Sequence, residues 1–375
     1  MKNAPIPQAL ADYLKNDKKL PALDGLRGWA VTLVILFHSA INGPAFDSKF
    51  SWFFYNIGWS GVDLFFVLSG FLITNVLLHS KSKPHYFRNF YARRVLRIFP
   101  LYYAFLVFQL IYYKEPHGFL YHLTYTSNFY LAYAQGVPEH TPAWLTWSLS
   151  IEEQFYLLWP LLIYFTRPKL LVIISASLIA IAFLFRANFF FEGVQPFVSY
   201  VLTYTRMDTL AWGTLIALVL NVNPKYFAPL KKISRVFLFL TPVAIWALWQ
   251  MFGTFYYSRN PLTAPVGFSL TALLYASLLV FVISHTGGLM WVFNNPLTRL
   301  LGKHSYAMYL IHVEIIIMWR EIFLHQAALN RFYITSRPLA MTAYLLLVMV
   351  TTFLAAWIIW HIYEKHFLKL KKHFQ

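Results

Sequence analysis

The sequence predicts an all-α integral membrane protein, with about ten transmembrane helices in one bundle and both termini in the cytoplasm. Of its 375 residues, 59% are hydrophobic and only 12% are charged, whereas soluble domains carry roughly 25% charged residues. The apolar residues come in blocks close to the ~20 residues with which a helix crosses the hydrocarbon of a bilayer. These blocks are apolar on all sides, which favours helices over the alternating strands of a membrane barrel.

The apolar blocks define the expected spans in chain order. They lie approximately at residues 26–43, 58–78, 98–113, 149–166, 169–187, 200–220, 236–252, 264–284, 304–319 and 339–360. Most of the 31 Lys and Arg residues fall on the side that holds both chain ends, and an excess of these residues marks the cytoplasmic side. We therefore expect a cytoplasmic tail at 1–22, a transmembrane domain at 23–364 and a basic cytoplasmic tail at 365–375.

Composition also limits the function. A net charge of +17 would suit nucleic acid, but the basic residues lie in short segments between apolar blocks, so we expect no nucleic-acid partner. The lipid bilayer and a polyphosphate cofactor are the partners that this distribution favours. The chain has no Cys, which excludes thiolate catalysis and Cys metal sites. HExxH, GxSxG and Walker motifs are also missing from the sequence, and no metal site is predicted.

The first candidate site lies in spans one and two. Span one reads LDGLRGWAVTLVILFHS, with Arg27 near its start and His38 about three turns further along. Span two crosses the membrane in the direction opposite to span one. Its Asp63, in GVDLFFVLSGFLIT, falls at nearly the same depth as His38. Buried charges in a bilayer are costly and often functional. An imidazole beside a carboxylate predicts a general base with an orienting partner, although His38 could instead only hydrogen-bond to a neighbouring helix.

The second candidate is a basic patch before span three, RNFYARRVLRIFP. It contains Arg88, Arg93, Arg94 and Arg97. Arg94 and Arg97 share a helix face, and guanidinium groups suit phosphates. Ordinary anchoring at the cytoplasmic surface explains the same pattern, and the residues alone favour that explanation.

Three further segments leave their role open. In TWSLSIEEQFYLLWP, Glu152 and its neighbour Glu153 either complement the dipole of a helix start or face an acceptor cavity at the outer end of span four. In LGKHSYAMYLIHVEI, Lys303 either contacts phosphate or reaches the membrane surface, and His312 lies deeper, where packing and function are not separable. The segment TRMDTLAWG adds a charged pair, Arg206 and Asp208, which is either functional or structural.

In order along the chain, these blocks resemble the acyltransferase-3 family of membrane O-acyltransferases. The resemblance runs through LDGLRGWAVTLVILFHS, GVDLFFVLSGFLIT, RRVLRIFP, WSLSIEEQFYLLWP, TRMDTLAWG and LGKHSYAMYLIH. It implies a ten-helix domain of a bacterial inner membrane that moves an acyl group, commonly acetyl, from cytoplasmic acyl-CoA to a hydroxyl of an envelope glycan or glycolipid. The family motifs fall on Arg27 and His38, on Arg94 and Arg97 as donor contacts, on Asp63 and on Glu152.

The resulting hypothesis assigns a role to each group. Arg94 and Arg97, with Arg93 or Lys303, hold the phosphates of the donor at a cytoplasmic mouth. His38, oriented by Asp63, deprotonates the acceptor or carries the acyl group transiently. Glu152 positions an acceptor that arrives from the outer side. This scheme requires the arginine-rich mouth and His38 to share one continuous channel.

Two other functions use the same residues. A transporter or flippase of a lipid-linked sugar would use the buried charges as a path, and an acyltransferase for a cytoplasmic small molecule would need no outer cavity. Some family members carry an additional C-terminal extracytoplasmic domain, resembling hydrolases, that completes the transfer. We therefore expect either the membrane domain itself or a separate extracytoplasmic protein to complete the transfer here.

Overall fold

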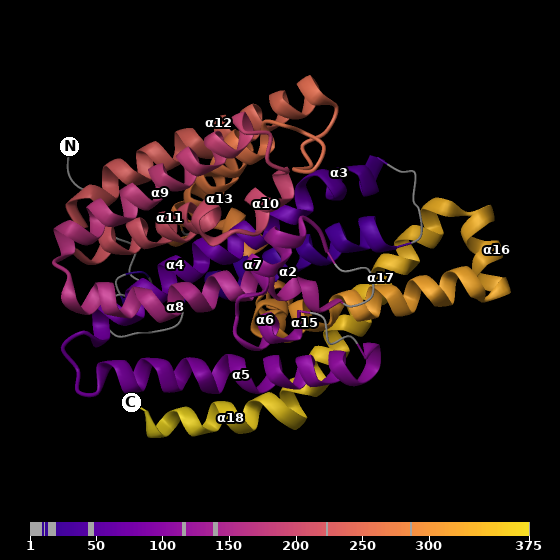
Figure 1. Ribbon diagram of the computed structural model, residues 1–375, viewed down its shortest axis with the longest axis horizontal. Helices are drawn as coiled ribbons and strands as arrows, with labels where there is room; N and C mark the ends of the chain where they lie inside the picture. The colour runs from indigo at the N-terminus through magenta and orange to yellow at the C-terminus, as the bar shows by residue number, and fades with distance from the viewer. Residues whose placement is uncertain are drawn as a thin grey trace.

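The computed structural model describes nearly the whole chain as helices (Figure 1). The described residues are 10, 12–13, 20–43, 49–114, 118–137, 142–222, 224–285 and 287–374. Every regular element within them is helical, as the sequence predicts. Most of the expected N-terminal tail at 1–22, including its lysines, lies outside the described residues.

Six helical stretches are long and apolar enough to cross a membrane. Their main helices are α4 (Gly61–Ser80, which follows the short α3, Lys49–Ile57), α5 (Tyr86–Tyr113), α9 (Pro168–Phe191), α12 (Phe227–Phe252), α13 (Phe268–Ser284) and α17 (Arg337–Ile359). Four more helices of 19 to 30 residues coincide with the other expected spans, namely α2 (Pro21–Asn42), α8 (Trp147–Phe165), α11 (Thr203–Val222) and α15 (Pro296–His325). A multi-pass helical bundle is confirmed, whereas the number of ten spans and the orientation stay predictions.

Short helices connect the long ones. They are α6 (Phe119–Leu123), α7 (Ser127–Ala134), α10 (Pro196–Val201), α14 (Trp291–Asn294), α16 (Ala327–Thr335) and α18 (Lys365–Lys369). A 3-10 turn at Pro142–Thr146 leads directly into α8. Long helices therefore form the body of the molecule, and the short helices α6, α7 and α10 lie near its middle in the view of Figure 1.

The outer helices of the bundle present apolar side chains outwards. In their most apolar windows, α9 and α12 bury only 22% and 11% of their residues, whereas the window that contains α4 buries 72%. Phe239 on α12 and Leu346 on α17 are largely exposed. Exposed apolar surface on this scale is expected where a helix faces lipid.

Two helices extend beyond the limits that the sequence predicts. Helix α5 begins at Tyr86, so the arginine patch lies on the helix itself rather than before it. Helix α17 continues through a π-helical turn at Trp360–Glu364 into α18 and a 3-10 turn. The end of the chain thereby lies alongside α5 (Figure 1), where the Arg88 guanidinium lies 5.7 Å from the Phe374 ring centroid.

Glycines allow α2 and α15 to approach until their backbones touch. A Cβ atom at Gly302 of α15 would lie 1.7 Å from the carbonyl oxygen of Asp24, and one at Gly28 of α2 would lie 2.1 Å from that of Thr298. Small residues at helix crossings permit this kind of close packing within membranes. The α2–α15 pair has the most extensive contact between helices in the described chain, and it carries both His38 and His312.

Two buried ion pairs hold α11 against its neighbours. Arg206 Nη2 lies 2.5 Å from Asp63 Oδ1 on α4, and Arg186 Nη2 on α9 lies 2.7 Å from Asp208 Oδ2. The guanidinium of Arg206 also packs on the Phe268 ring, with 4.3 Å to its centroid. Each charge is paired with an opposite charge on another helix, which is how charged groups persist in an apolar interior.

These pairs correct two expectations. Asp63 does not orient His38, because its described hydrogen bonds are to Arg206 and Thr209. Arg206 and Asp208 do not pair with one another, since each binds a residue of a different helix. The structural interpretation of these charges is the one that the contacts support.

We predict that Gly302→Ala destabilises the protein, because the added methyl group would overlap the Asp24 backbone. Overpacking of this kind costs about 1–3 kcal/mol. Gly288→Ala is the matched control, since a Cβ there meets nothing within 4 Å. Thermal unfolding of both variants in detergent measures the effect, and equal unfolding midpoints would contradict the tight α2–α15 contact.

We predict that Asp63→Ala destabilises the protein by about 3–5 kcal/mol, because it leaves the Arg206 charge buried without its partner. The double variant Asp63→Leu with Arg206→Met removes both charges and should recover most of that stability. Denaturant unfolding of the two variants provides the comparison. A stable Asp63→Ala protein that has lost its activity would instead show a chemical role for the carboxylate.

Candidate functional site

The arginines gather around a small cavity, here called the arginine cavity. Its volume is about 90 Å³, and its polar lining includes Arg27, Ser69, Arg94, Arg97, Glu152 and Tyr156. These residues come from α2, α4, α5 and α8. The guanidinium of Arg94 lies 5.7 Å from the centroid of the Tyr156 ring. Three positive groups around one carboxylate leave the cavity with an excess of positive charge, which suits an anion such as a phosphate.

Glu152 belongs to this cavity and not to an outer acceptor site. Its Oε1 accepts a hydrogen bond from the Ser69 hydroxyl, and that hydroxyl in turn accepts one from the Tyr156 hydroxyl at 3.1 Å. The expected contact with an acceptor cavity is therefore not seen, since Glu152 lines the arginine cavity and not the aromatic one. The helix containing Glu152 begins at Trp147, and the carboxylate lies far enough along it to reach the arginines.

A second, larger cavity contains His38 and is here called the aromatic cavity. Its volume is about 720 Å³, within the range of small-molecule sites. His38 lines it together with many aromatic side chains, among them Trp144, Trp147, Tyr200, Tyr256 and Tyr257. Gln135, Gln195 and Ser258 add uncharged polar groups. Among the described residues that line this cavity, none is Asp or Glu.

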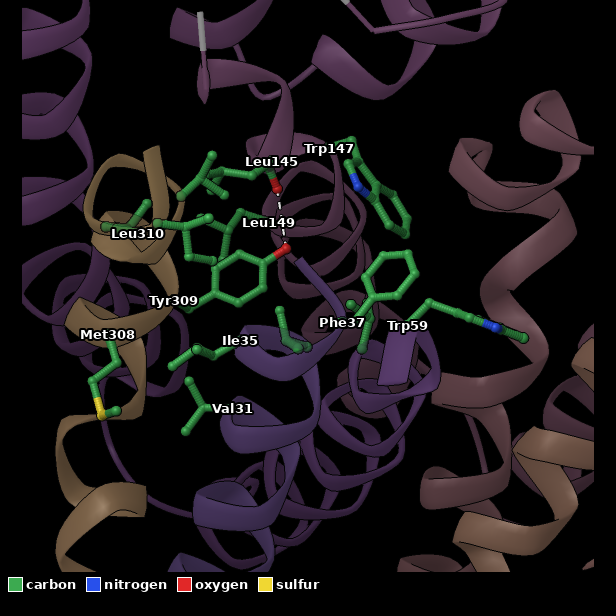
Figure 2. Close-up of a cluster of buried hydrophobic side chains, with 14 of the residues drawn as sticks. Val31, Ile35, Phe37, Trp59, Leu145, Trp147, Leu149, Met308, Tyr309 and Leu310 are labelled. Carbon is green, nitrogen blue, oxygen red and sulfur yellow. Dashed lines mark hydrogen bonds between the residues drawn. The ribbon is translucent and has the colours of Figure 1, made fainter. Parts of the chain in front are cut away.

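The two cavities adjoin at a shared part of their lining, here called the partition. Val62 and Tyr309 line both of them. The Tyr309 hydroxyl donates a hydrogen bond to the Leu145 carbonyl oxygen at 3.1 Å, as Figure 2 shows. The Ser148 hydroxyl lies 2.6 Å from the same Tyr309 hydroxyl. The two cavities thus meet at these side chains, and the single channel that joins the arginines to His38 stays a prediction.

The partner of His38 is another histidine. Its Nδ1 lies 2.9 Å from Nε2 of His312 on α15, and both rings are buried. Nδ1 of His312 lies 2.6 Å from the Tyr309 carbonyl oxygen. The Trp144 ring packs at 5.3 Å from the His38 ring centroid, at a steep angle. His38 is thus held between α15 and the wall of the aromatic cavity.

Besides Asp63, which pairs with Arg206, three of the predicted residues line neither cavity. Arg93 and Lys303 are exposed, and Lys303 Nζ lies 4.2 Å from the centroid of the Trp360 ring. Glu153 does not line the arginine cavity, although its neighbour Glu152 does. Donor contacts by Arg93 and Lys303 stay predictions.

Two features of the site were not predicted, and the sequence contains a signal for one of them. His312 and Tyr309 occur in YAMYLIH, three residues apart and thus on one helix face. This spacing favours a joint role for the two side chains. Ser69 carried no such signal. A serine in an apolar span is common at helix crossings, and only the packing of α4 against α8 shows that it meets Glu152.

Comparisons with known proteins agree with this arrangement. Residues 20–361 match a family described as an acyltransferase domain. The chain is 31% identical over 329 residues to the peptidoglycan O-acetyltransferase OatA of Listeria monocytogenes, with 80% of this chain and 50% of the relative covered. It is 29% identical over 330 residues to the putative peptidoglycan O-acetyltransferase YrhL of Bacillus subtilis, with 81% and 50% covered.

A third relative is the O-acetyltransferase OatA of Staphylococcus aureus, 30% identical over 334 residues, with 82% of this chain and 52% of the relative covered. The chain thus spans about half the length of these curated relatives. No solved structure matches it. The match of one family across residues 20–361, which contain both cavities, confirms the resemblance seen in the sequence, and the chain belongs to the acyltransferase-3 family.

Proposed function

We propose that the protein is an O-acetyltransferase of a bacterial plasma membrane, which moves an acetyl group from acetyl-CoA to a hydroxyl of a cell-envelope glycan. The observation that carries this proposal is the pair of cavities with contrasting linings, one rich in arginine and one aromatic, which share Val62 and Tyr309 as a wall. One named relative is a peptidoglycan O-acetyltransferase and a second is a putative one, so the glycan strands of peptidoglycan are the acceptor that we propose.

The arginine cavity supports a donor that carries phosphates. Arg94 and Arg97 lie on adjacent turns of α5, and Arg27 faces them from α2. The cavity of about 90 Å³ has the volume of roughly three liquid water molecules. The nucleotide portion of CoA is far larger, so it would bind at the mouth while only the narrow pantetheine arm enters.

The acetyl group must then pass the partition. The thioester would approach His38 only when the Tyr309 ring moves away from Val62 and its hydroxyl leaves the Leu145 carbonyl. Such a hydrogen bond contributes about 0.5–1.5 kcal/mol, so donor binding can supply the required free energy. The Glu152–Ser69–Tyr156 chain lies on the donor side, where it would orient groups around the arm.

The aromatic cavity supports a sugar acceptor. Flat aromatic faces pack against the C–H faces of sugar rings, and a few amide and hydroxyl groups fix their orientation. The cavity of about 720 Å³ has room for more than one sugar unit. In the proposed reaction, the acceptor O–H gives its proton to His38 as its oxygen attacks the thioester carbon. The C–S bond then breaks, and the leaving thiolate receives that proton.

We predict that two substitutions separate donor binding from chemistry. Arg94→Gln should raise the KM for acetyl-CoA about tenfold or more, because charged hydrogen bonds contribute about 1.5–3 kcal/mol. His38→Ala should abolish acetyl transfer. The rise in unfolding temperature on addition of CoA should be the same as in the wild type. Both are assayed with radiolabelled acetyl-CoA and soluble peptidoglycan fragments on the purified protein.

Arg167→Gln is the control for the first substitution, since Arg167 is exposed and lines neither cavity. Acetyl transfer by His38→Ala at the wild-type rate would refute the proposed chemistry. A wild-type protein that CoA does not protect would refute the proposed donor and favour transport of a lipid-linked sugar.

We predict that Trp144→Ala raises the KM for the glycan acceptor by up to about tenfold, the scale of a lost aromatic contact. The KM for acetyl-CoA should not change, because Trp144 lines only the aromatic cavity. Trp246→Ala is the matched control, since that side chain is 60% exposed on the outer helix α12. Steady-state kinetics with each substrate varied in turn decides the outcome, and a change confined to the donor KM would contradict the assignment.

A further inference from the structure

The hydrogen-bond partners of His312 determine which of its nitrogens carries the proton. Its Nδ1 lies 2.6 Å from the backbone carbonyl oxygen of Tyr309. A carbonyl oxygen only accepts hydrogen bonds, so His312 Nδ1 is the donor. A neutral imidazole has one N–H group, and therefore Nε2 of His312 presents a lone pair.

The same reasoning continues to His38. The lone pair on His312 Nε2 faces His38 Nδ1 at 2.9 Å, so His38 Nδ1 must be the donor in this contact. The remaining nitrogen of His38, Nε2, is then the one without a proton. His38 lines the aromatic cavity, in which the acceptor is proposed to bind.

The surroundings favour a neutral pair of rings. His312 is fully buried and His38 nearly so, and a buried charge without a counter-ion is costly. Asp63, the carboxylate expected beside His38, is instead bound to Arg206. A neutral acceptor such as His312 can therefore orient His38 without adding a charge to the apolar interior.

We propose that His312 is a positioning residue that fixes the tautomer of His38, with the proton on Nδ1 and the lone pair of Nε2 available to the acceptor hydroxyl. This inference rests on the proposed function. His312 itself takes no proton from the substrate. Its contribution is to hold His38 in the one tautomer whose free nitrogen can accept the proton as the acceptor oxygen attacks the thioester. When the C–S bond breaks, His38 returns that proton to the thiolate and is neutral again.

The packing of the two helices supports this role. Gly28 and Gly302 bring α2 and α15 into backbone contact, which fixes the separation of the rings that they carry. The Trp144 and Phe37 rings lie 5.3 and 4.9 Å from the His38 ring centroid. A ring confined in this way has few alternative orientations, so its tautomer depends on the acceptors around it, which are His312 Nε2 and the Val34 carbonyl oxygen.

Two substitutions at one position test the proposal. His312→Gln places an amide oxygen near the position of Nε2 and keeps an acceptor for His38. His312→Asn places its amide near the position of Nδ1, so it keeps the bond to the Tyr309 carbonyl but does not reach His38. If His312 only fills space, the two variants should behave alike, and His312→Ala supplies the comparison if His312→Asn does not fold.

We predict that His312→Asn lowers kcat for acetyl transfer roughly 10²-fold, the scale of a general base contribution, with the KM for acetyl-CoA unchanged. His312→Gln should retain most of the wild-type kcat. Both rates are measured with acetyl-CoA and soluble peptidoglycan fragments. Equal kcat values for the two variants would overturn the positioning role.

A second measurement does not depend on acetyl transfer. Diethyl pyrocarbonate labels the unprotonated nitrogen of an accessible imidazole, and peptide mass spectrometry quantifies its reaction at His38. The wild type and His312→Gln should label at similar rates, whereas His312→Asn should label about tenfold more slowly, the effect of one lost hydrogen bond. Equal labelling rates in all three proteins would overturn the tautomer assignment. Absence of transfer in the wild type, with the labelling pattern intact, would refute the proposed function alone.

Discussion

The backbone contact between α2 and α15 is the constraint on which the candidate site depends. Without side chains at Gly28 and Gly302, the two helices lie close enough for His38 and His312 to share a hydrogen bond. The same contact brings Arg27 near the wall of the arginine cavity at the other end of α2. One helix crossing thus sets the geometry of both cavities, because each is lined by α2 and α15.

The sequence predicted the helices and their approximate depth in the membrane, but not the direction in which each side chain points. Apolar blocks determine where a helix crosses, and Arg27, Arg94 and Arg97 do gather around one cavity. Asp63 was placed at the depth of His38 and nevertheless faces Arg206. Depth follows from counting residues along one helix, whereas direction depends on which helices pack together, and that arises from contacts far apart in the chain.

Helix ends and weak polar signals account for the other differences. The sequence began the third span at residue 98, because the apolar block begins there, although the arginines before it belong to the same helix, Tyr86–Tyr113. Glu152 was placed at the outer end of its span, but it meets Ser69 beside the arginines. His312 was noticed and left undecided, since a histidine in an apolar helix has equally good structural explanations until its partner is known.

The partition formed by Val62 and Tyr309 has a consequence for the energy supply of the cell. A bacterial plasma membrane stores energy as a proton gradient, and a water-filled pore from one cavity to the other would dissipate it. The Tyr309 hydroxyl is bound to Leu145 and Ser148, and in the proposed reaction its side chain lies on the path of the acyl group from one cavity to the other. A side chain that leaves this position only while the acyl group passes would limit ion leakage to that step.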